Sequence, residues 1–79
     1  MFVLTAMLIV AGTTEIKTEV IGSYNSFGEC AVEANATTNL IWHLSAGRTE
    51  VLASTPGMIV LVSPDGHQIA LTCEEKVNT

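Results

Sequence analysis

Two cysteines and two histidines are the side chains of this sequence with the most distinctive chemistry. Cys30, His43, His67 and Cys73 supply two sulfur and two nitrogen donors, which is the donor set of a structural zinc site. Zinc modules present their ligands as closely spaced pairs, whereas each of these residues is far from the next along the chain. We therefore expect no metal site and no cofactor.

Cys30 and Cys73 also have the positions needed for a disulfide that closes a large loop. In the chain-entropy model such a bond stabilises a small domain by a few kcal/mol. The alternative is a pair of buried free thiols that act as small hydrophobic side chains in a reducing compartment. The residues alone leave both alternatives open, but the lack of a Cys-x-x-Cys pair argues against redox catalysis.

A serine, an aspartate and a histidine follow one another at Ser63, Asp65 and His67. A catalytic triad needs the histidine between the other two groups and an oxyanion site beside the nucleophile. Neighbouring residues of one turn seldom reach that geometry, and Ser63-Pro64-Asp65-Gly66 is a typical turn sequence. We expect no catalytic residues here and do not interpret the chain as an enzyme.

Residues 2–11 are the segment around which we expect the other elements to pack, and Thr5 is its only polar side chain. As a strand it would be apolar on both faces and therefore covered on both. We expect Leu4 and Leu8 to face a helix of the same chain. Val3, Met7 and Ile9 would then form an oligomer interface.

The same stretch is not interpreted as a membrane or export segment. It is shorter than the roughly 20 apolar residues that span a bilayer. The first cation of the chain is Lys17, whereas a signal peptide carries its positive charge ahead of the apolar run. The sequence predicts no membrane contact and a cytoplasmic location, with a periplasmic or secreted protein as the alternative.

The remaining pattern predicts a second strand over residues 15–23, a helix from Ser26, and strands over 58–62 and 68–74. A capping box would open the helix, with Ser26 accepting from the Glu29 amide and Glu29 reaching back to the Ser26 amide. The helix would end by Gly47, although residues 35–39 are weak helix formers. Residues 48–57 are interpreted as a connection, with a short extended piece at residues 50–53.

These elements predict one α+β domain over residues 1–79. The fold would be a four-stranded, mainly antiparallel sheet in the order strand-strand-helix-strand-strand, with one helix on one face. The start of its helix at Ser26, Phe27 and Cys30, with Cys73 in the closing strand, resembles small uncharacterised α+β proteins of bacteria, phages and environmental sequences. The resemblance implies a compact accessory or binding protein rather than an enzyme, and it assigns no active residues.

Composition limits the classes of partner. The chain is 48% hydrophobic and 14% charged, below the roughly 25% charged residues of typical globular domains, which predicts a homo-oligomer, with a dimer favoured. Eight acids against three cations give a net charge of −5, so we expect no nucleic-acid partner.

The function expected from these features is a small non-catalytic interaction protein that self-associates through an apolar sheet face or a sheet edge. One alternative is an acidic inhibitor or decoy, for example phage-encoded, that binds a host protein. Another is a small-molecule binder with a site between helix and sheet or between subunits, where Trp42, His43 and Cys30 would converge. Trp42, His43 and Arg48 are the candidate anchor for contact with an unidentified protein partner.

Overall fold

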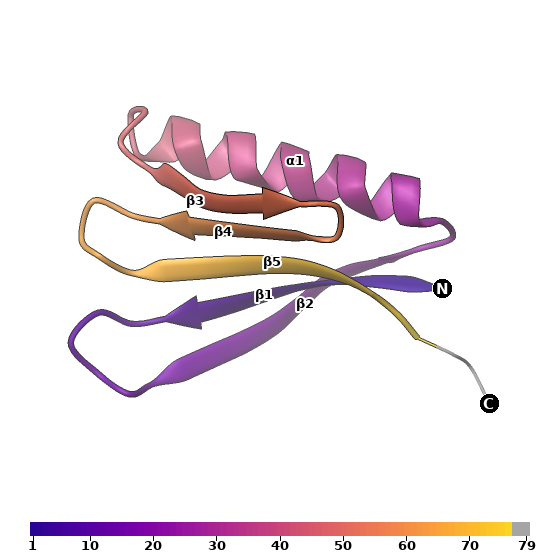
Figure 1. Ribbon diagram of the computed structural model, residues 1–79, viewed down its shortest axis with the longest axis horizontal. Coiled ribbons are helices and arrows are strands. Elements are labelled where there is room, and N and C mark those ends of the chain that lie inside the picture. Colours follow the sequence, from indigo (N-terminus) through magenta and orange to yellow (C-terminus); the bar gives the residue numbers. More distant parts are fainter. Residues whose placement is uncertain (77–79) are drawn as a thin grey trace.

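One antiparallel sheet and one helix make up the part of the chain that the structure describes, residues 1–76 (Figure 1). The computed structural model contains β1 (Phe2–Ile9), β2 (Ile16–Tyr24), α1 (Phe27–Leu44), β3 (Glu50–Thr55), β4 (Met58–Val62) and β5 (Gln68–Glu75). The strands lie in the order β2-β1-β5-β4-β3, and every neighbouring pair is antiparallel. The α+β class predicted from the sequence is confirmed.

The predicted number of strands is wrong, because the sheet has five strands rather than four. The additional strand is β3, which occupies most of the segment interpreted as a connection. Pro56 and Gly57 alone join it to β4, and Gly57 has φ +91°. Proline followed by a glycine of positive φ is typical of a type II turn. Pro56 and Gly57 are therefore the turn of a β3–β4 hairpin and not the end of an irregular connection.

The first and last strands lie side by side within the sheet. β1 pairs with β2 on one side and with β5 on the other, so Leu4 has Gly22 and Cys73 as its cross-strand neighbours. An interior strand has both backbone edges hydrogen-bonded and sits under the helix on one face. This position accounts for the uninterrupted apolar sequence of β1.

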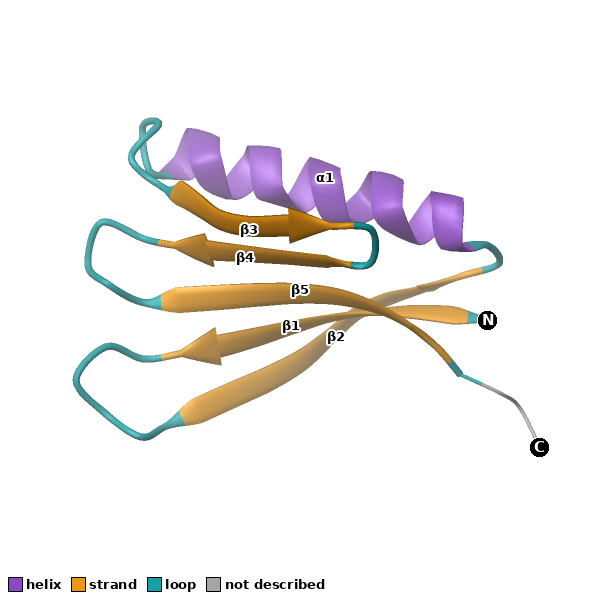
Figure 2. Cartoon of the chain, viewed as in Figure 1, coloured by secondary structure: helices purple, strands orange, loops and turns teal. Residues whose placement is uncertain are grey.

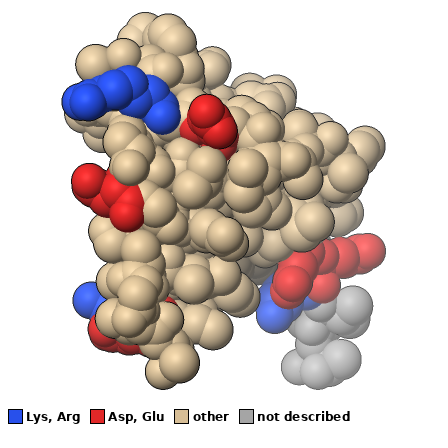
Figure 3. All heavy atoms as spheres, turned by 60° about the vertical axis from the view of Figure 1, so that its left-hand side comes forward, with Lys and Arg blue, Asp and Glu red and all other residues tan. Residues whose placement is uncertain are grey.

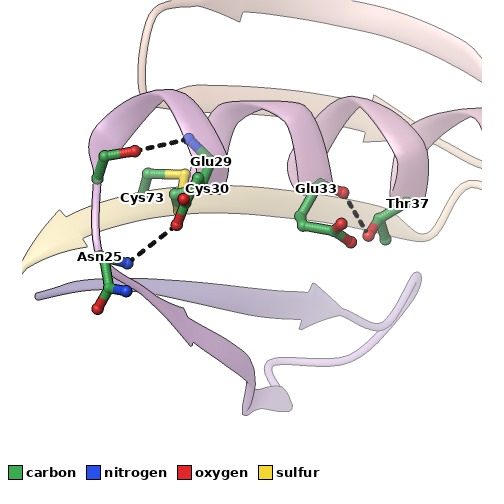
Figure 4. Close-up of a disulfide and its surroundings, with 7 residues drawn as sticks. Asn25, Glu29, Cys30, Glu33, Thr37 and Cys73 are labelled. Carbon is green, nitrogen blue, oxygen red and sulfur yellow. Dashed lines mark hydrogen bonds between the residues drawn. A yellow bond between two sulfur atoms is a disulfide. The ribbon is translucent and has the colours of Figure 1, made fainter.

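The helix begins at the predicted N-cap, where Ser26 Oγ accepts a hydrogen bond from the Glu29 amide at 3.2 Å. The reciprocal half of the predicted capping box is wrong. The Glu29 carboxylate accepts instead from the amide of Asn25, one residue earlier, also at 3.2 Å (Figure 4). Either bond satisfies a backbone donor just ahead of the helix, so the carboxylate still stabilises this end.

The polar middle of α1 does not interrupt the helix, which runs unbroken along the strands (Figure 2). The hydroxyls of Thr37 and Thr38 donate to the carbonyl oxygens of Glu33 and Ala34, at 2.8 and 2.9 Å. Threonine in a helix interior commonly satisfies its hydroxyl in this way, against the preceding turn.

The core lies between α1 and one face of the sheet. Its buried members are Leu4, Cys30, Ala34, Ile59, Leu61 and Leu71. The helix contributes only small side chains, Cys30 and Ala34, which let its backbone approach the leucines of the strands. Leu44 is 79% exposed, because it follows Ile41, the last helical residue packed against the core.

Both edge strands are irregular. The β1–β2 register skips Ile21, since Gly22 faces Leu4 and Val20 faces Thr5. The β3–β4 register likewise skips Leu52, which has no partner in β4. An extra residue of this kind twists an edge strand and weakens its ability to pair with another chain.

Candidate functional site

The two cysteines form a disulfide that joins the first turn of α1 to β5, with their Cα atoms 6.1 Å apart (Figure 4). The alternative of two free thiols is therefore wrong. Cys30 is fully buried, so the bond forms part of the core rather than a surface redox site. A disulfide is compatible with an oxidising compartment, although it does not by itself assign one.

The two histidines make contacts that do not involve this disulfide. His67 Nδ1 accepts a hydrogen bond from the amide of Ala11 at 2.9 Å, which ties the β4–β5 turn to the β1–β2 turn. His43 makes an edge contact with the ring of Trp42, with 5.4 Å between ring centroids. Across residues 1–76, no three His, Cys, Asp or Glu side chains come together in a way that could hold a metal ion.

The residues of the β4–β5 turn serve the turn itself. The Ser63 carbonyl accepts from the Gly66 amide at 2.9 Å, and Ser63 Oγ accepts from the His67 amide at 3.2 Å. The imidazole of His67 is engaged with Ala11, on another segment, rather than with the serine hydroxyl. This arrangement is a hydrogen-bonded turn and lacks the nucleophile-to-base contact that acyl transfer needs.

The candidate contact anchor lies at the end of the helix. Trp42 is 48% exposed, and its ring covers Gly47, where a Cβ atom would lie 2.9 Å from it. Arg48 Nε donates to the Ser45 carbonyl at 3.4 Å, in the same capping turn. The structure thus brings Trp42 and His43 into contact, and the side chains of Trp42 and Arg48 also contact the turn that ends the helix.

The face of the sheet opposite α1 is the larger candidate site. Alternation along β1 places Leu4 with the core beneath the helix, so Val3, Met7 and Ile9 point away from it. Met7 is 38% exposed and Ile9 is partly exposed, whereas Val3 is only 8% exposed and offers little surface to a partner.

Neighbouring strands extend this surface, because directly paired residues share a face. We call it the open face. Besides the nearly buried Val3, its apolar members are Met7, Ile9, Ile16, Val20, Ala53, Met58, Val60, Val62 and Ala70. Threonines at 5, 18, 55 and 72 and Gln68 fill the positions between them. Sequence reasoning missed the contributions of β2, β4 and β5, because they depend on strand order and register.

Charge lies only at the margins of the open face within the described chain. Glu74 is opposite Val3 at one end and forms an ion pair with Lys76 at 3.8 Å. Glu50 is at the far corner, on the edge strand β3. On the side of the molecule seen in Figure 3, acidic side chains lie in separate patches, some of them beside a basic side chain, and form no continuous stripe.

Two hollows flank the helix, and neither has the lining predicted for a small-molecule site. The first, about 260 Å³, lies between Ala31, Ala34 and Asn35 of α1 and the β3–β4 turn. The second, about 380 Å³, lies between the helix end and the β4–β5 turn and includes Arg48 and Asp65. Trp42, His43 and Cys30 line neither of them.

Comparison with known proteins gives no relative from which a role could be assigned to the open face. No family model, no curated protein and no solved structure matches the chain. Among residues 1–76, α1 does not have the combination of length and apolar character that would let it cross a membrane.

Proposed function

We propose that this chain is a non-catalytic interaction protein that self-associates through the open face of its sheet. The observation that carries the proposal is the apolar surface formed by all strands on the side that α1 leaves uncovered. Ile16 and Val20 of this face are 58% and 62% exposed, and Met58 is 41% exposed. Contiguous apolar surface of this kind is typical of sites that meet another protein.

The face is a better contact surface than the edges. Pairing of two edge strands requires a regular, flat row of unpaired backbone groups. β2 and β3 each contain an unpaired extra residue, Ile21 and Leu52, which disturbs that row. The alternative of edge-to-edge association is therefore disfavoured, and the proposal is restricted to the face.

The dimensions of the open face are sufficient for a modest interface. Five strands about 4.8 Å apart, with about 20 Å of paired length, cover roughly 480 Å² on each copy. Two copies together bury about 1,000 Å², which is near the lower limit for a specific protein–protein contact. We therefore expect reversible association rather than an obligate oligomer.

A second copy of the chain suits this face because of where the charges lie. Each copy carries a net charge of −5 and repels another copy wherever acidic residues meet. The centre of the open face is uncharged. When two such faces stack about a two-fold axis that passes through the middle of the sheet, Glu50 of one copy lies away from Glu50 of the other. Sheets packed in this way lie about 10 Å apart with interdigitated side chains.

Sedimentation equilibrium of the wild type and of Met7→Glu tests the proposal. A carboxylate at Met7 would be buried without a partner in the associated state, so we expect the association constant to fall at least about tenfold. Thr14→Glu is the matched control, because it adds the same charge in the exposed β1–β2 turn, and it should associate like the wild type. A strictly monomeric wild type at high concentration would contradict the proposal.

A further inference from the structure

The outer surface of α1 carries a second apolar surface, separate from the open face. Val32, Ala36, Leu40 and Leu44 occur at every fourth position and form one ridge along the helix. Val32 is 64%, Leu40 59% and Leu44 79% exposed. The inward side of the same helix carries the buried Cys30 and Ala34, so the ridge is not used by the fold.

Charge is confined to the start of this helix. Glu29 and Glu33 lie in its first two turns, and the described helix has no acidic, lysine or arginine side chain after Glu33. A second copy with the same net charge of −5 meets least repulsion along the remaining length, where the ridge lies. A basic partner, in contrast, would gain nothing from this uncharged portion.

The ridge is also complementary to itself in shape. Ala36 is a small side chain between the larger Val32 and Leu40, so it leaves a notch beside two projections. When two copies of one helix cross with their every-fourth-residue ridges interdigitated, at an angle near −50°, a projection of each enters a notch of the other. Leu40 of one copy can thus pack against Ala36 of its partner, and the reverse contact follows by symmetry.

We infer that α1 pairs with α1 of a second copy through this ridge, and that the chain therefore assembles beyond a dimer. The inference rests on the proposed function, because the open face supplies the other contact. The two surfaces lie on opposite sides of the molecule, one on the helix and one on the uncovered side of the sheet. Two different two-fold contacts on opposite sides of one protomer join copies alternately by sheet and by helix, and they form an open chain when the two axes do not intersect.

The helix contact should be the weaker of the two. The ridge runs from Val32 to Leu44, a rise of about 18 Å along the helix, and is one side chain wide. It covers less area than the open face and falls in the range of weak, transient contacts. Dimers formed through the sheet should therefore appear first as the concentration rises, and longer chains later.

Sedimentation equilibrium on four proteins tests this inference. We expect the wild type to exceed the mass of a dimer at high concentration. Leu40→Glu should stop at a dimer held by the open face, and Met7→Glu should stop at a dimer held by the helix. The double variant should be monomeric, because both apolar contacts then contain a buried carboxylate.

The outcomes separate the two proposals. A Leu40→Glu variant that assembles like the wild type, whether as dimers or as longer chains, overturns the helix contact and leaves the open face in place. A wild type that stops at the dimer overturns assembly beyond a dimer. A monomeric Leu40→Glu variant overturns the open face instead. Val32→Glu repeats the test if Leu40→Glu does not fold by circular dichroism, and Thr14→Glu, which lies outside both surfaces, should assemble like the wild type.

Discussion

Of all pairs of side chains, Cys30 and Cys73 are expected to contribute most to the free energy of unfolding. Their disulfide joins residues 43 positions apart and fastens α1 to an interior strand of the sheet. A bond that closes a loop of this length restricts the unfolded chain by about 4 kcal/mol in the chain-entropy model. It compensates for the small contribution of α1 to the core, where Cys30 and Ala34 are its fully buried residues.

Replacing both cysteines by alanine should lower the free energy of unfolding by about 2–4 kcal/mol. The double variant avoids leaving a lone thiol, and urea unfolding followed by circular dichroism measures the change. Reductant provides the matched control, because it should destabilise the wild type by a similar amount and leave the variant unaffected. An identical unfolding midpoint for the oxidised wild type and the variant would contradict this role.

Gly57 is the residue on which the β3–β4 turn depends. Its φ of +91° is strained for any residue with a Cβ atom, and a Cβ there would lie 3.3 Å from the ring of Phe27. Gly57→Ala should therefore destabilise the protein by about 1–2 kcal/mol. Gly28→Ala is the control, because Gly28 is helical and has open space around it, so that variant should be neutral or up to about 1 kcal/mol more stable in thermal and urea unfolding. Equal effects of the two substitutions would argue against a strained turn.

At the scale of the elements, the irregular edges protect the sheet from pairing with other chains. Leu52 has no partner in β4, and it is 54% exposed, so it contributes little to the core. Deletion of Leu52 would bring Val51 and Ala53 into regular alternation opposite Leu61 and Val60. The outer edge of β3 would then be flat and almost uncharged, which is the condition for edge-to-edge aggregation.

We therefore expect the Leu52 deletion to aggregate at lower concentration than the wild type, with increased thioflavin T fluorescence. Leu52→Ala is the matched control, since it removes the side chain but keeps the extra residue, and it should remain as dispersed as the wild type. If Leu52→Ala aggregates as readily as the deletion, the side chain rather than the bulge protects this edge.

The elements also differ in how far the sequence predicts them. The apolar run of β1 and the Ser26 N-cap are local patterns, and they correctly predicted a strand and the start of a helix. β3 was predicted only as a short extended piece and not as a strand of the sheet, because Glu50–Thr55 is exposed at every position and has no apolar alternation to identify it. The open face could be only partly predicted, since Val20 and Met58 join Met7 through strand pairings that no local pattern contains.

At the scale of the whole molecule, the chain combines an acidic net charge with two uncharged apolar surfaces. The eight acids outnumber the three cations, so two copies repel one another before their apolar surfaces meet. In the proposed association, burial of the open face would be balanced against this long-range repulsion. The two terms respond differently to salt, because added salt screens the repulsion while leaving apolar burial intact or strengthened.

Added sodium chloride should therefore tighten self-association. Between about 0.01 M and 0.1 M the Debye length falls from about 30 Å to about 10 Å, so repulsion between the copies is largely screened while the contact itself is retained. We expect the dissociation constant from sedimentation or light scattering to fall severalfold over this range, and sodium sulfate at equal ionic strength to lower it further. An interface built from ion pairs would respond in the opposite direction, so a dissociation constant that rises with salt would contradict association through the open face. Lys17→Glu, which makes the net charge more negative without altering that face, should steepen the dependence and confirm that the salt acts on repulsion between the copies.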